Sequence, residues 1–390
     1  MSVNRTAIVI GGSLSGLFTG VLLRSIGWQV DIYERSSHSL SSRGGGIVLQ
    51  PDVVEAFNMA GIPHQNLGVV ASERYYLQRN GSIQRMPMRQ TLTSWNTLYN
   101  SLRRHFPDKY YHQGKCLKDF QQDDDKVTAI FTDDLPSNGG TQATGDLLIG
   151  ADGLTSTVRQ ILLPTYDPMY AGYVGYRGLV NEKDLDPEPA AIMTEKFVFY
   201  QFRNSHILQY VIPGENESLV PGERRFNWVW YVNYDQATEL PRVLTDKNGK
   251  RRDYSMPPGM MANDIEQEMR DYAQSVLVEP FEKLIAATKE PFVQAILDLG
   301  VPNMAFNRIA LVGDAAFIPR PHTAASVSKA AANAIALSNV LQEHDHDVSN
   351  SLKAWELNQL ALGMHLWKRG KNLGETSQFM YGKERWQPSK

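Results

Sequence analysis

The start of the chain places two short apolar runs on either side of one amphipathic stretch. Residues 7–10 are all apolar, which is typical of a buried parallel strand. Apolar side chains then recur at helical spacing from Leu14 to Leu22, and Gly27 follows as a helix stop. Residues 30–33 predict a second strand. A strand, a helix and a strand in this order predict the beginning of an α/β unit with a parallel sheet.

The middle of the chain has a different pattern. Aromatic and aliphatic side chains alternate with polar ones over residues 197–202, 207–212 and 226–232. Pro-Gly pairs at 213–214 and 221–222 mark turns, so these runs predict a mostly antiparallel sheet.

From residue 263 onward the spacing of apolar residues is helical again, interrupted by one predicted strand at 308–312. We therefore predict a mixed α/β fold with a parallel-sheet unit, a second β-sheet unit and C-terminal helices. The first unit is expected to comprise residues 1–72, 97–172 and 284–390, and the second residues 73–96 and 173–283.

Composition narrows the possible functions. A net charge of −3 argues against a nucleic-acid partner, because phosphate binding needs concentrated positive charge. The single cysteine, Cys116, excludes an internal disulfide and a cysteine-cluster metal site, and the nine histidines are scattered, so no metal is expected. No run approaches the ~18 apolar residues of a membrane helix. Nothing resembles a signal peptide, so we expect a cytoplasmic protein without a membrane partner.

The first chemical motif lies between the first predicted strand and helix, at residues 11–16. Gly11 suits a tight turn, and Gly16 suits close packing of helix on strand, as a dinucleotide pyrophosphate requires. Ser13 stands where the usual second glycine would be. Glu34 ends the second predicted strand, where an acid accepts ribose hydroxyls. A plain strand-to-helix turn is the alternative, and this motif alone does not separate FAD from NAD.

Two later segments carry a more specific pattern. Residues 146–153 read DLLIGADG and residues 308–316 read RIALVGDAA. Together with the glycine motif, and in this order, they resemble the group A flavoprotein aromatic hydroxylases. That resemblance implies a Rossmann-type FAD-binding unit interleaved with a substrate-binding sheet, and no separate NAD(P)H domain. The FAD contacts that it implies are Gly11, Gly12, Ser13, Ser15, Gly16, Glu34, Arg35, Arg43, Gly46, Ile47, Cys116, Leu117, Asp152, Gly313, Asp314, Pro321 and Ala325.

Several stretches, among them residues 46–51, 170–178 and 319–322, resemble the 2,6-dihydroxypyridine 3-hydroxylase branch of that family. Other positions depart from the family pattern. Phe317 stands where many members have histidine, and Trp95 where many have arginine. Side chains also replace the family's usual glycines beside the flavin, so we expect crowding there. These positions are Ala324, Ser326 and Val327.

The resemblance implies an enzyme that uses NAD(P)H, FAD and O₂ to hydroxylate an electron-rich aromatic ring, such as a dihydroxypyridine. Tyr210 is the candidate from the substrate sheet, His322 could exchange protons near neutral pH, and Arg177 could hold an anionic substrate. The alternatives are sheet packing, a loop position and a surface ion pair. An oxidase or reductase of the same fold, a flavin-poor non-catalytic relative, and a homodimer also stay open.

Overall fold

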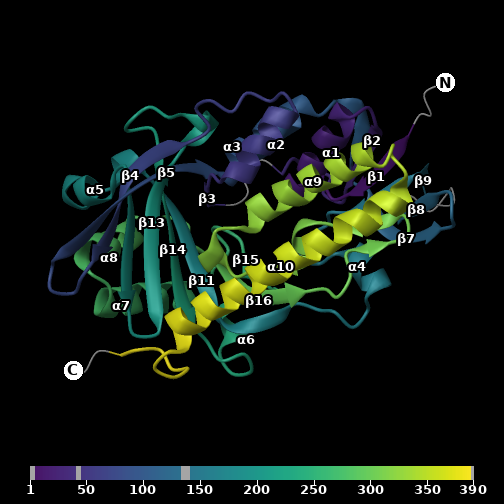
Figure 1. Ribbon diagram of the computed structural model, residues 1–390. Coiled ribbons are helices and arrows are strands. Elements are labelled where there is room, and N and C mark those ends of the chain that lie inside the picture. Colours follow the sequence, from purple (N-terminus) through teal and green to yellow (C-terminus); the bar gives the residue numbers. More distant parts are fainter. Residues whose placement is uncertain (1–4, 41–44, 133–140, 388–390) are drawn as a thin grey trace.

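The computed structural model describes residues 5–40, 45–132 and 141–387. Within them the chain builds two units, each around one large sheet, with a small third sheet at the edge of the first (Figure 1). This arrangement confirms the predicted mixed α/β fold. Among the same residues, no helix combines the length and the apolar character needed to cross a membrane.

The first sheet has the strand order β17-β18-β10-β1-β2-β6, and all pairings but β17–β18 are parallel. Its central strand, β1, is the apolar run at the start of the chain, and its side chains are buried on both faces as a central parallel strand requires. The strands are β1 (Thr6–Ile10), β2 (Gln29–Glu34), β6 (Tyr111–Gln113), β10 (Leu147–Gly150), β17 (Ala305–Phe306) and β18 (Ile309–Leu311).

Helices cover this sheet, and α1 packs against α9 and α3. Their buried faces join the strands in one hydrophobic core. The helices of this unit are α1 (Leu14–Ser25), α2 (Pro51–Met59), α3 (Trp95–His105), α4 (Thr157–Leu162), α9 (Ser326–Glu343) and α10 (Val348–Phe379). The small sheet has the order β7-β8-β9, formed by β7 (Cys116–Gln122), β8 (Val127–Thr132) and β9 (Gln142–Gly145).

The second sheet has the order β15-β16-β11-β14-β13-β12-β4-β5-β3, and β19 also pairs with β16. All its pairings are antiparallel except β4–β12. The strands are β3 (Gly46–Val48), β4 (Val69–Leu77), β5 (Ile83–Ser94), β11 (Met169–Asn181), β12 (Lys196–Phe202), β13 (Ser205–Ile212), β14 (Arg225–Asn233), β15 (Ser255–Met256), β16 (Phe292–Gly300) and β19 (Phe317–Ile318).

The two faces of the second sheet have different neighbours. On β14, Trp228 and Trp230 pack into a core with side chains of α7 and α8, whereas Val229 and Tyr231 point to the opposite face, toward the first unit. The helices on the first of these faces and beside it are α5 (Pro187–Met193), α6 (Leu240–Val243), α7 (Asn263–Val276) and α8 (Glu279–Ala286).

Strand pairing joins segments that lie far apart in the chain. Both β3 and β16 lie in the second sheet, and they come from the ranges 1–72 and 284–390, which the sequence predicts for the first unit. The cause is long-range pairing: β3 pairs with β5, and β16 pairs with β11. Hydrophobic runs alone do not specify such partners.

One helix spans both units. The 32-residue helix α10 packs against α9 in the first unit and against β13, β14 and β16 in the second (Figure 1). Three glycines lie on its contact face. A Cβ atom would lie 2.3 Å from the Phe317 ring at Gly363, 2.8 Å from the Arg320 backbone nitrogen at Gly370, and 2.5 Å from the Tyr173 hydroxyl at Gly374. The helix therefore lies closer to its neighbours than any larger residue would permit.

Candidate active site

The glycine turn between β1 and α1 is built to lie close to its surroundings. Gly11 has φ +105°, and a Cβ there would lie 2.4 Å from the carbonyl oxygen of Ala151. A Cβ at Gly16 would lie 1.9 Å from the carbonyl oxygen of Gly11. Ser13 precedes α1 without a side-chain cap, and no acidic residue lies in the first turn. The backbone amides at the start of α1 therefore form a site that suits an anionic group such as a pyrophosphate.

Glu34 braces this turn. One carboxylate oxygen accepts the Gly12 amide at 2.8 Å, and the other accepts the Ser36 amide at the same distance. The Tyr111 hydroxyl donates to the Gly12 carbonyl at 2.9 Å, and burial raises the pKa of Tyr111. Glu34 lies where the sequence predicts a ribose ligand, but it also holds the turn in shape.

The other residues predicted on the adenosine side lie around the end of β2. Arg35 donates to the Thr155 hydroxyl at 3.1 Å. Cys116, which is exposed, and Leu117, which is buried, begin β7. Directly before this strand, the Lys115 amide donates to the Glu34 carbonyl. Arg43 lies outside the described residues.

Asp152 has protein partners on both carboxylate oxygens. Ser156 Oγ donates to one at 2.5 Å, and the Thr157 amide donates to the other at 2.7 Å, so the side chain caps the start of α4. Burial raises the pKa of Asp152, against the effect of these hydrogen bonds. In this structure its contribution to the site is to fix the loop behind the glycine turn.

The Gly313-Asp314 loop lies directly after β18 and touches the start of α1. Gly313 has φ +61°, and a Cβ there would lie 2.1 Å from Ser15 Oγ. The Gly313 amide donates to Asn333 of α9 at 3.0 Å. The Asp314 side chain is 44% exposed and lines a cavity, and its carboxylate lies 2.9 Å from the ammonium group of Lys329. The predicted ligand-binding end of the parallel sheet is therefore open.

That cavity has a volume of about 370 Å³ and lies between the two units. β3 forms one wall, the inner face of the second sheet another, and the loop before α9 a third. It brings together seven residues that the sequence singled out, namely Gly46, Ile47, Arg177, Tyr210, Asp314, Pro321 and Ala325. The backbone of Gly46 packs closely against Tyr210, since a Cβ at Gly46 would lie 2.4 Å from the Tyr210 ring.

The polar groups at the Gly46 end of the cavity are hydrogen-bond donors. Asn227 accepts the Gly46 amide at 2.8 Å, which fixes its side-chain orientation and leaves its buried NH₂ group without a partner. The Nε of Arg177 is also buried and unpaired, and among the described residues no carboxylate forms an ion pair with Arg177. Burial raises the pKa of Tyr210, so its phenol stays protonated. Sequence reasoning missed Asn227, although it shares a strand face with Val229 and Tyr231.

His322 has a different setting from the one expected. It does not line the cavity; its Nε2 lies 2.8 Å from the Tyr173 hydroxyl, and its ring lies 4.4 Å from the Tyr231 ring. Burial, aided by His206 and Arg320, holds the pKa of His322 well below its ordinary value. In this structure His322 lies behind the cavity wall, where its ring packs against the ring of Tyr231.

The departures from the family pattern at the start of α9 face the same cavity. Ala324, Ser326 and Val327 all line it. Ala324 adopts a left-handed backbone conformation with φ 52° and ψ 26°. Helix α9 begins without a side-chain cap or an acidic residue in its first turn, so its first amides are open to an anionic or carbonyl partner.

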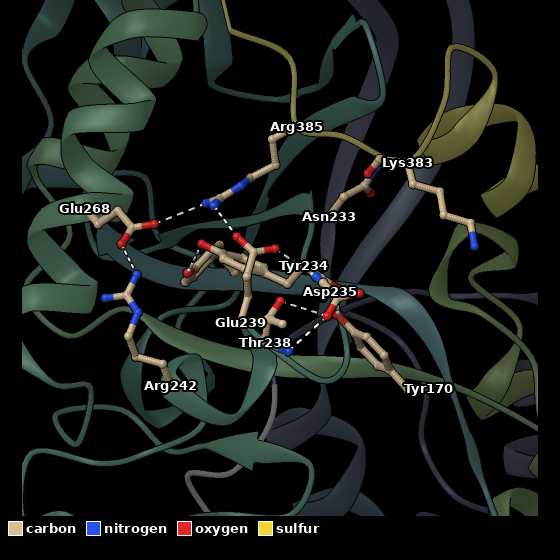
Figure 2. Close-up of polar contacts among 11 residues, drawn as sticks. Tyr170, Asn233, Tyr234, Asp235, Thr238, Glu239, Arg242, Glu268, Lys383 and Arg385 are labelled. Atoms are coloured by element: carbon tan, nitrogen blue, oxygen red, sulfur yellow. Dashed lines mark hydrogen bonds and ion pairs between the residues drawn. The ribbon is translucent and has the colours of Figure 1, made fainter.

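A second, larger cavity of about 1370 Å³ lies beside the C-terminal segment, but it contains none of the predicted site residues. Figure 2 shows charged side chains around it that pair with one another. Arg385 pairs with Glu239 at 2.5 Å and with Glu268 at 3.1 Å, and Arg242 pairs with Glu268 from the other side. The network fastens the C-terminal segment to the second unit. The smaller cavity is therefore the candidate active site.

Comparisons with known proteins show which proteins this chain is similar to. A family model described as FAD binding domain-like matches residues 170–298. A 2,6-dihydroxypyridine 3-monooxygenase from Paenarthrobacter nicotinovorans is 35% identical over 360 residues, covering 91% of this chain and 87% of that protein. A 6-hydroxynicotinate 3-monooxygenase from Pseudomonas fluorescens is 25% identical, covering 90% of this chain and 87% of that protein.

Solved structures show the same likeness. The structure of 2,6-dihydroxypyridine-3-hydroxylase from Arthrobacter nicotinovorans superposes with a TM-score of 0.89 at 33% identity, covering 99% of this chain and 95% of that one. Klebsiella pneumoniae HpxO, complexed with FAD and uric acid, superposes with a TM-score of 0.78 at 22% identity, covering 97% of this chain and 90% of that one. The second likeness concerns the fold.

Proposed function

Because this chain belongs to the group A FAD-dependent aromatic hydroxylases, we propose that it uses FAD, NAD(P)H and O₂ to hydroxylate a hydroxylated nitrogen heterocycle. The observation that carries the substrate class is the cavity beside Asp314, where Arg177 lies among aromatic walls and pairs with no carboxylate of the described residues. Relatives named for dihydroxypyridine, hydroxynicotinate and urate support a ring with nitrogen and oxygen substituents.

The residues present fit FAD. The glycine turn and the start of α1 would hold the pyrophosphate, Glu34 the adenosine ribose, and Asp314 the hydroxyls of the flavin chain. The open amides at the start of α9 would face the flavin ring. When bound, FAD supplies electron transfer from NAD(P)H and the activation of O₂.

The remaining steps fall to the cavity's own side chains. The rings of Phe197, Tyr210 and Tyr231 provide flat apolar walls that exclude water from an aromatic substrate. Arg177 offers donors only, so it favours an oxygen substituent that is anionic. A ring with an ionised hydroxyl is richer in electrons, which is the property that electrophilic hydroxylation requires.

Two further assignments rest on the same frame. We propose that the two sheets correspond to a cofactor-binding unit and a substrate-binding unit, with the active site between them. We also propose a cytoplasmic location, which the single cysteine and the need for NAD(P)H support.

A substrate panel tests the proposal. Purified protein should be yellow, and hydroxypyridines should stimulate NAD(P)H oxidation and gain one atom of ¹⁸O from ¹⁸O₂, measured by mass spectrometry. Hydroxylation of carbocyclic phenols alone would refute the proposal that the substrate is a nitrogen heterocycle. Oxidation of NAD(P)H without incorporation for every compound would favour the reductase or oxidase alternative, and a colourless protein that fails to bind FAD would favour the non-catalytic one.

The role of Arg177 has its own test. Removing the Arg177 cation from the cavity wall costs a charged hydrogen bond of about 1.5–3 kcal/mol, so Arg177→Met should raise KM roughly 10- to 150-fold. The exposed Arg89 supplies the control, since Arg89→Met should leave KM unchanged. A KM for Arg177→Met equal to that of the wild type would remove Arg177 from the substrate site.

A further inference from the structure

Lys329 is a buried cation beside the candidate FAD site for which neither the sequence motifs nor the proposed reaction supplies a role. It lies in the first turn of α9, and its side chain is 1% exposed. Its ammonium group donates to Asp314 at 2.9 Å and to the carbonyl of Phe317. Burying an ammonium group costs several kcal/mol unless it is paired, so a lysine in this place needs a compensating interaction.

The pair is unequal in exposure. Lys329 is enclosed, whereas the Asp314 side chain is 44% exposed and reaches into the cavity. Burial lowers the pKa of Lys329, and the carboxylate of Asp314 opposes that shift. The Asp314 carboxylate thus compensates the buried cation, and the cation in turn holds the carboxylate in one orientation. Among the described residues, no other side chain donates to Asp314.

The loop that carries Asp314 is attached to α9 at three points. Lys329 binds the Asp314 carboxylate and the Phe317 carbonyl, and one helical turn later Asn333 accepts the Gly313 amide at 3.0 Å. Asn333 is itself held by Gln359 at 2.9 Å. The start of α9 and the loop after β18 therefore form one rigid wall of the cavity.

We propose that Lys329 is a positioning residue for FAD, which holds the Asp314 carboxylate in one orientation and adds a buried positive charge to the wall that faces the flavin. This inference rests on the proposed function, because it assigns FAD to the cavity. A fixed cation near the flavin, together with the helix start, stabilises added negative charge and so raises the flavin's midpoint potential. Lys329 touches Asp314 and not the reacting atoms. It therefore affects how tightly FAD binds and the midpoint potential of the bound flavin.

The experiment compares FAD binding and flavin potential in two variants. Lys329→Met removes the charge in a side chain of similar length, and Lys329→Gln removes the charge but keeps a donor for Asp314. Both variants should lower FAD affinity by roughly 10- to 100-fold, measured by fluorescence titration, and both should lower the midpoint potential of the bound flavin. The control is Lys353→Met, which replaces an exposed lysine of α10 and should change neither quantity.

A double-mutant cycle with Asp314→Asn separates the proposed role from a merely structural one. If Lys329 acts through Asp314, the combined variant should lose less FAD affinity than the sum of the two single losses. A folded Lys329→Met or Lys329→Gln variant with wild-type affinity and potential would overturn the inference while leaving the proposed function intact. Wild-type protein that fails to bind FAD would overturn the proposed function itself.

Discussion

At the scale of single residues, the backbone of Ala324, at the edge of the cavity, is strained. A left-handed conformation costs a residue with a Cβ roughly 1–2 kcal/mol, and Ala324 adopts it with φ 52°. Its carbonyl accepts the side-chain amide of Gln50, which helps to hold it there.

Replacing this alanine should therefore stabilise the protein. We expect Ala324→Gly to raise the free energy of unfolding by up to about 1 kcal/mol after the greater chain entropy of glycine is subtracted. Ser326→Gly, at the first position of α9, should lower it by a similar amount or less. The two substitutions together should let FAD bind closer to the backbone of this loop. Denaturant unfolding and FAD titration measure both effects, and a less stable Ala324→Gly protein would contradict the argument.

Motif residues and unpredicted residues differ in how far their partners lie along the chain. Gly11, Glu34 and Asp314 were found because each belongs to a short pattern with a local physical reason. Asn227 was missed because its partner, Gly46, is 181 residues away. Lys329 was missed because helical spacing predicts a core or surface position, and a buried ion pair is visible only once the loop and the helix are in place.

At the scale of elements, the sequence predicts where strands lie but not which strands pair. The runs predicted at 197–202, 207–212 and 226–232 correspond to β12, β13 and β14, each within two residues at either end. Alternation of side chains carries that information locally. The pairing of β16 with β11 depends instead on which edges meet after collapse, and no local pattern encodes it.

The contact of β13 with α10 predicts a pH dependence of stability. Burial lowers the pKa of His206 to about 4, and its Nδ1 lies 2.7 Å from Ser377 Oγ. His322, Tyr231 and Ser377 surround it, and none of them is a carboxylate. The unfolded chain takes up this proton near pH 6.5, so stability is fully present above that pH and falls as the pH drops toward 4.

His206→Gln should remove that contribution. The wild-type protein is expected to lose up to about 1.4 kcal/mol per pH unit from this one proton between pH 6.5 and 4. Denaturant unfolding across that interval should show a shallower slope for the variant, with stability unchanged above pH 7 apart from a constant offset. Equal slopes for the two proteins would show that His206 is protonated in the folded state.

At the scale of the whole molecule, α10 holds the two units in a fixed relation. Its glycines bring it against Phe317, against the Arg320 loop and against Tyr173, so the cavity wall and the second sheet share one support. Arg320 adds to this support, since it pairs with Asp298 of β16 at 2.7 Å and with Glu375 of α10 at 3.1 Å.

Adding a methyl group at one of the glycines of α10 should disturb both units. Gly363→Ala places a methyl group against the Phe317 ring and should lower the free energy of unfolding by about 1–3 kcal/mol. FAD affinity should fall with it, because Phe317 follows directly on the loop of Asp314. Ala361→Val, on the exposed side of the same helix, serves as the control. A Gly363→Ala protein as stable as the control would mean that α10 can shift without cost.

The interleaving of the chain also has a consequence for how the protein is made. The turn at Gly11 leaves the ribosome early, but Ser15 meets Gly313 only after the strand β18 and helix α9 have been synthesised. At about 5–20 residues per second, the first half of the site waits roughly 15–60 s for the second. Nascent chains that stop before residue 314 carry the glycine turn without Asp314 and Lys329. Flavin uptake in translation extracts should consequently begin only with nearly full-length chains, which makes the cofactor a reporter of completed synthesis.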